Sequence, residues 1–169
     1  MSLGEIVTVS SGKNTERQTD GAYPVYGSTG LISRTNHPAY TGRSILVARV
    51  GANCGFCYTV AGEYDVSDNT LILRVKDSIN CSYIYYLLYN ERLNKYAKGG
   101  GQPLITASQL KNLQIPLPPL PEQERIVAIL DRFDALVNDL SSGLPAELNA
   151  RRQQYEYYRD KLLTFKPAV

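Results

Sequence analysis

Short apolar runs separated by turn residues fill the first two thirds of the chain. β-Branched and aromatic residues dominate segments 44–50, 56–60 and 70–75, and Gly, Asn or Ser residues separate these segments. Runs of this length between turn clusters predict a small, mostly antiparallel β-sheet. We expect a further short strand at Val25–Tyr26 and a last strand at Leu113–Pro116.

A change to helical spacing interrupts these strands. The residues that recur at near-helical spacing between 82 and 96 are Ile84, Leu87, Leu88 and Leu93. Either Asn80 or Ser82 can cap the predicted helix. A shorter helical turn is expected at residues 106–110. Strands combined with a few helices predict an α+β domain over residues 1–116.

The pattern changes completely after the Pro-rich junction at residues 117–121. Apolar residues then recur at alternating intervals of four and three, the heptad pattern that one helix offers to another. The seam comprises Ile126, Leu130, Phe133, Val137, Leu140 and Leu144. After an interruption at Gly143–Pro145, a second stretch continues it with Leu148, Tyr155, Tyr158 and Leu162. We therefore expect residues 122–166 to form a long heptad-patterned helix or a helix pair, and the pattern leaves open whether the interruption is a kink or a turn back.

A continuous seam needs a partner. It can pack back on the preceding domain, or it can dimerise with a second copy or a similar helix pair. We favour dimerisation, because a regular heptad repeat specifies a partner helix better than it specifies a sheet face.

Length and charge limit the classes of protein only weakly. The 169 residues carry a net charge of +2. This charge divides into +3 over residues 1–116 and −1 over residues 117–169, which neither requires nor excludes nucleic acid. No apolar run reaches the roughly 18 residues that a membrane span needs, and no signal peptide opens the chain. We expect a cytoplasmic protein.

Residues for catalysis or metal binding are sparse. Cys54 and Cys57 have the spacing of a zinc or redox pair, but only Cys81 and His37 remain as further ligands, and neither has ligand-pair spacing. Free thiols in a reducing compartment are the better interpretation. Phosphate-loop, nucleophile-elbow and dinucleotide motifs are missing. We expect no metal, no cofactor bound by this chain and no catalysis.

Polar and aromatic residues beside the Gly-rich turns indicate a recognition surface instead. Ten of the 13 Tyr residues precede position 100, and a Tyr side chain combines an apolar ring with a polar tip. Arg can pair with guanine, and Asn or Gln can pair with adenine, in the major groove of DNA. The candidates of these types are Arg34, Arg43, Arg49, Asn53, Lys98 and Gln102.

Several segments together resemble the specificity subunits of type I restriction–modification systems. The junction and helices that carry the resemblance are Pro116–Val127, Ala128–Leu136, Gly143–Glu147 and Arg151–Arg159. The turns at Tyr26–Gly30 and Arg49–Gly55 are similar to turns of their target recognition domains. The resemblance adds Tyr26, Ser28 and Thr29 to the candidate DNA contacts.

The resemblance implies a non-catalytic subunit that reads double-stranded DNA. Such a subunit carries modification subunits, which methylate adenine with S-adenosylmethionine, and ATP-driven restriction subunits. It usually holds two recognition domains and two helical regions, whereas this chain holds one of each. It is therefore either a half-length subunit that works as a homodimer or a fragment. A homodimer is expected to read a split palindromic site.

The helix then sets the distance between the two half-sites. Residues 122–142 alone would span about 31 Å, or roughly nine base pairs, and one kinked helix over 122–165 would span about 66 Å, or roughly nineteen. Two rival hypotheses remain. One is a coiled-coil adaptor whose first domain binds protein without binding DNA, and the other is a metal-dependent enzyme that uses the three Cys residues and His37.

Overall fold

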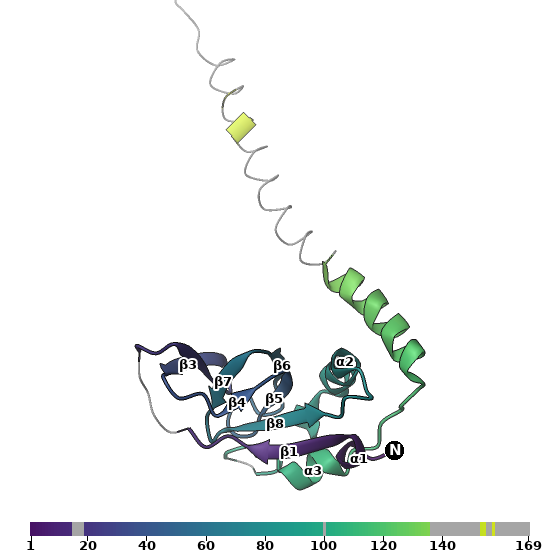
Figure 1. The fold of residues 1–169 in the computed structure, drawn as a ribbon, viewed down its shortest axis with the longest axis horizontal. Coiled ribbons are helices and arrows are strands. Elements are labelled where there is room, and N and C mark those ends of the chain that lie inside the picture. Colours follow the sequence, from purple (N-terminus) through teal and green to yellow (C-terminus); the bar gives the residue numbers. More distant parts are fainter. Residues whose placement is uncertain (15–18, 100, 136–152, 155–156, 158–169) are drawn as a thin grey trace, which may run out of the picture. The chain divides into compact units, whose positions relative to one another are not determined.

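The computed structural model describes residues 1–14, 19–99, 101–135, 153–154 and 157 (Figure 1). Its elements are, in order, α1 (Leu3–Ile6), β1 (Val7–Ser11), β2 (Tyr23–Gly27), β3 (Gly30–Thr35), β4 (Tyr40–Thr41), β5 (Ser44–Ala48), β6 (Cys57–Val60), β7 (Glu63–Val66), β8 (Thr70–Val75), α2 (Cys81–Glu91), the 3-10 helix η1 (Leu93–Tyr96) and α3 (Ala107–Lys111). Residues 120–135 are also helical. The predicted α+β class is confirmed.

The strands form two four-stranded sheets. The first has the order β1-β8-β5-β6 and the second has the order β3-β2-β7-β4. The pairing of β2 with β7 is parallel, and the other strand pairs of these sheets are antiparallel. Since β7 belongs to one sheet and β8 to the other, the short turn between them passes from sheet to sheet.

Two apolar cores lie on opposite faces of the first sheet. Along β5, the side chains of Ile45 and Val47 join the main core with the helices, while Leu46 between them joins a smaller core with Tyr64 of the second sheet. Successive side chains of a strand point to opposite faces. Burial on both faces therefore explains why β5 is a continuous apolar run.

Several predicted elements have different bounds in the structure. The helix expected over 82–96 ends at Glu91, because Arg92 adopts a left-handed φ of 51° and η1 follows. The helix is capped by Asn80, whose side chain accepts a hydrogen bond from the Tyr83 backbone N–H (3.1 Å). The strand expected from Phe56 begins one residue later, at Cys57.

The last predicted strand, Leu113–Pro116, is wrong. Only Gln114 forms an isolated bridge there, with Ser2. Two features prevent a longer strand pairing. Helix α1 begins directly after Ser2, so the partner segment is not extended beyond that residue. Pro116 has no backbone N–H that could donate to a neighbouring strand. A backbone bond from Leu3 N to Leu113 O (2.8 Å) still fixes the segment against the N-terminus.

The chain divides into two compact units, Met1–Val127 and Ala128–Val169. The first unit includes the Pro-rich junction and the beginning of the helix at 120–135. Within it, the side chain of Gln123 accepts a hydrogen bond from Asn80 N (3.0 Å) and donates one to Pro118 O (2.8 Å). This buried amide fixes the junction to the start of α2.

The helical region is described only in part. Predicted seam residues Ile126 and Leu130 are half-buried, and Phe133 is 61% exposed. Ile126 packs against the main core. The seam residues that lie outside the described residues are Val137, Leu140, Leu144, Leu148, Tyr155, Tyr158 and Leu162, and the interruption at 143–145 lies outside them too. Among the described helices, none is long and apolar enough to cross a membrane.

Candidate nucleic-acid interface

Two loops that the sequence singled out separately lie side by side at the end of β5. Val50 forms a β-bridge with Leu104, and Leu104 forms another with Lys98. Backbone bonds from Gly51 N to Pro103 O (3.1 Å) and from Ile105 N to Arg49 O (2.8 Å) complete the contact. The loops that carry Arg49–Asn53 and Lys98–Gln102 are therefore joined along their main chains.

A third predicted segment, the turn between β2 and β3, meets the first loop through Asn69. The Asn69 carbonyl accepts a hydrogen bond from the hydroxyl of Ser28 (3.3 Å) and another from the backbone N–H of Arg49 (3.0 Å). Thr29 is exposed on the same turn. Asn69 is not among the residues predicted from the sequence, although an Asn immediately before a predicted strand is a turn signal.

The Arg49 guanidinium is partly committed to the protein itself. Its Nη1 donates to the hydroxyl of Ser11 (3.3 Å). Its Nε is buried and has no hydrogen-bond partner among the described residues. A bidentate contact with guanine needs two free N–H groups of the fork. Arg49 therefore has fewer guanidinium N–H groups free for a base contact than its residue type alone indicates.

Two predicted arginines lie elsewhere. Arg43 and Arg49 flank opposite ends of β5, and a separation of six residues along a strand corresponds to about 20 Å. Arg43 donates to the hydroxyl of Ser82 (2.9 Å). Arg34, on β3, donates to the carbonyl oxygens of Gly21 (2.7 Å) and Ala22 (3.2 Å). Neither side chain joins the cluster around Arg49.

Lys98, Gln102 and Asn53 are exposed, whereas Tyr26 is half-buried. The Tyr26 ring packs against Tyr58 and Tyr64, with centroid distances of 6.2 and 6.0 Å. Tyr58 in turn donates its hydroxyl hydrogen to Gly27 O (2.6 Å), and burial raises the pKa of that phenol. The ring of Tyr26 therefore packs within the protein, beneath the turn that carries Ser28.

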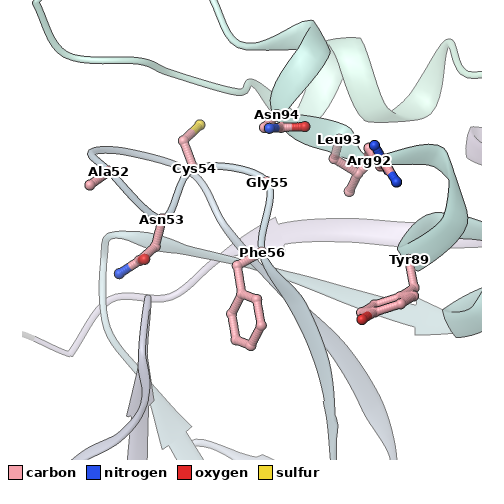
Figure 2. A pocket seen from close by; sticks show the side chains of 9 residues that line it. All are labelled: Ala52, Asn53, Cys54, Gly55, Phe56, Tyr89, Arg92, Leu93 and Asn94. Carbon is pink, nitrogen blue, oxygen red and sulfur yellow. The ribbon is translucent and has the colours of Figure 1, made fainter.

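Beside this cluster lies an open depression of about 440 Å³ (Figure 2). The residues that line it are Ala52, Asn53, Cys54, Gly55, Phe56, Tyr89, Arg92, Leu93 and Asn94. Phe56 is 49% exposed and Tyr89 is 62% exposed. Tyr89 is one of the ten Tyr residues that indicated a recognition surface, whereas Phe56 was expected within the apolar run at 56–60 and not at the surface.

The three cysteines and His37 do not form a metal site among the described residues. Cys54 and Cys57 are buried, Cys81 is half-buried and His37 is exposed. Within the part of the chain that the structure describes, no three His, Cys, Asp or Glu side chains are placed to hold a metal ion. Burial raises the pKa of the Cys57 thiol from 9.0 to about 11.

Loops that carry exposed polar, basic and aromatic side chains on a rigid β scaffold are typical of a binding domain. Residues 1–150 match the type I restriction modification DNA specificity domain, and the chain belongs to this family. The membership confirms the resemblance that the junction and helix motifs indicated.

Individual relatives agree with this family. The chain is 29% identical over 146 residues to the type I restriction enzyme EcoprrI specificity subunit of Escherichia coli, which covers 82% of this chain and 36% of that subunit. It is 42% identical over 93 residues to the EcoR124I/EcoR124II specificity subunit of the same organism, with 53% and 23% covered. The S subunit of a type I restriction-modification system from M. genitalium shares its fold, with a TM-score of 0.71 at 22% identity over 95% of this chain and 44% of that one. The chain thus spans less than half the length of each.

Proposed function

We propose that this chain is a non-catalytic DNA-recognition and scaffold subunit of a type I restriction–modification complex. The observation that carries the proposal is the meeting of three loops, around Ser28, Arg49 and Lys98, at one end of the β-domain. Each of the three loops is a candidate DNA-contacting segment from its residue types alone. Family membership supports the same interpretation.

The loop geometry suggests a division of roles. Arg49 donates to Ser11 and has a covered Nε, so it fits a phosphate contact or a supporting role better than a guanine fork. Exposed Asn53 and Gln102 have the amides that pair with adenine, and exposed Lys98 suits a phosphate. Arg34 and Arg43, outside this cluster, would at most contact the DNA backbone at its margins.

We infer a homodimer as the working form. The helix at 120–135 exposes the apolar side chains of Ile129 (39%) and Phe133 (61%). A second copy would cover these side chains and would supply a second reader related by two-fold symmetry. Such a dimer would read a split palindrome and direct modification and restriction subunits to it, while binding no cofactor itself.

Expression of the chain with its cognate modification subunit tests the proposal. We expect the two proteins to co-purify, and we expect methylome mapping of the host to show one interrupted, palindromic motif. Binding of a duplex with that motif should weaken steeply with salt, as phosphate contacts require. An asymmetric motif would refute the homodimer, and a complex without sequence-selective binding would refute the recognition role.

A further inference from the structure

The loop between β5 and β6 displays two side chains suited to one kind of base pair. Asn53 is exposed in this loop, and Phe56 follows three residues later with half of its surface accessible. Figure 2 shows both side chains extending away from the loop toward the same side as Tyr89, while the sulfur of Cys54 points the opposite way. The loop therefore offers an amide and an apolar ring together.

This loop has a fixed shape. Cys54 N donates to Gly51 O (3.0 Å), Phe56 N donates to Asn53 O (2.9 Å) and Gly55 N donates to Ala48 O (2.8 Å). Gly55 also lies so close to η1 that a Cβ at this position would collide with the backbone of Asn94. A prepared loop loses little conformational freedom when it binds a ligand.

The opposite wall of the depression carries the groups expected beside a nucleic-acid backbone. Tyr89 exposes a phenol, and its ring packs against Tyr85 at a centroid distance of 6.0 Å. Arg92 is exposed, and its guanidinium pairs with none of the other described side chains. Arg and Tyr both donate to phosphate oxygens. The combination of a free cation, two amides and two rings favours a nucleic acid as the occupant over an apolar peptide.

We propose that the Asn53–Phe56 loop reads an A·T base pair in the major groove. This inference rests on the proposed DNA-recognition function and deepens it. Asn pairs with the N6 and N7 atoms of adenine, and Phe makes an apolar contact with the thymine C5-methyl group. Both features lie on the major-groove edge of one A·T pair. Asn53 would therefore bind adenine, Phe56 would cover the thymine methyl, and Arg92 and Tyr89 would contact the adjoining phosphates.

Uracil substitution gives a direct test, because uracil lacks only the thymine methyl group. We would assemble the chain with its modification subunit and measure binding to duplexes in which each thymine of the mapped motif is replaced in turn. Loss of one buried methyl group corresponds to about a four-fold weaker affinity. We expect this loss at one thymine position per half-site in the wild type, and no uracil effect there in Phe56→Ala.

Two further variants control the experiment. Phe56→Leu keeps an apolar side chain and should retain the uracil effect, while Asn90→Ala, an exposed change on α2 outside the depression, should leave every affinity unchanged. A uracil effect that persists in Phe56→Ala, or that is missing at all positions in the wild type, would overturn the inference while leaving DNA recognition intact. Loss of co-purification with the modification subunit in Phe56→Ala would assign the surface to that protein partner and would also overturn the inference. Failure of the wild-type complex to bind its motif would overturn the proposed function itself.

Discussion

The Gln123 side chain offers a measurable test of how the Pro-rich junction is fixed. It is 2% exposed, and it joins Asn80 N and Pro118 O through its two amide atoms. Gln123→Leu keeps the volume but leaves both backbone groups without this partner. Each hydrogen bond contributes about 1 kcal/mol, and a buried group left unpaired costs roughly 1–3 kcal/mol, so the free energy of unfolding should fall by about 2–4 kcal/mol.

Urea unfolding of the whole chain, followed by circular dichroism, measures this loss. A decrease of this size should also lower the melting temperature by about 10 °C for a domain of this length. The exposed neighbour Glu124 supplies the control, since Glu124→Ala should change stability by no more than about 0.5 kcal/mol. If Gln123→Leu is as stable as Glu124→Ala, the junction is held by its apolar contacts alone and the reasoning about the amide is wrong.

Three further results are expected. Gly55→Ala should destabilise the chain by at least about 1 kcal/mol more than Gly51→Ala. Both glycines have a positive φ, but only a Cβ at position 55 would meet the backbone of η1. Equal losses of stability in urea unfolding would contradict this prediction. Phe133→Glu should weaken self-association at least about ten-fold in analytical ultracentrifugation, whereas Ala128→Glu on the same helix should weaken it less, and an unchanged dimer would remove Phe133 from the interface. The pKa of Cys57 is raised to about 11 in the folded state, so stability should decline as pH rises above 9.0, and Cys57→Ala should flatten that decline in urea titrations from pH 8 to pH 11.

Much of the first sheet could be predicted because its central strands, β5 and β8, are buried on both faces. Continuous apolar runs identified β5 and β8, and helical spacing identified α2. Among the described strands, β1, β3, β4 and β7 escaped prediction. β3 mixes half-buried and exposed residues before its buried last residue, Thr35, and β4 has only two residues, so neither has a hydrophobic period that a sequence reveals. The end of α2 escaped for a different reason, since the left-handed turn at Arg92 depends on tertiary packing.

The sequence identified single residues of the candidate site, but it did not show which of their loops lie together in the fold. Residue type and neighbouring turns pointed to Arg49, Asn53 and Lys98, and the structure brings their loops together. The same criteria pointed to Arg43, which lies at the far end of the strand that ends before Arg49. Whether a residue lies at one end of a strand or at the other depends on where the strand begins and ends, and residue type does not give these bounds. In the same way, Phe56 was expected to begin a strand, whereas β6 begins one residue later, at Cys57, and Phe56 lies in the exposed loop.

The way the β5–β6 loop is secured has a consequence for how binding preference can diversify. Its ties to the rest of the domain are bonds between main-chain atoms, such as Gly51 N to Pro103 O and Gly55 N to Ala48 O. Such bonds do not depend on the side chains at positions 52, 53 and 56. Substitutions there can therefore alter what the surface selects while the loop keeps its course. New preferences could arise by single mutations at these positions, with no need for a compensating change in the sheets.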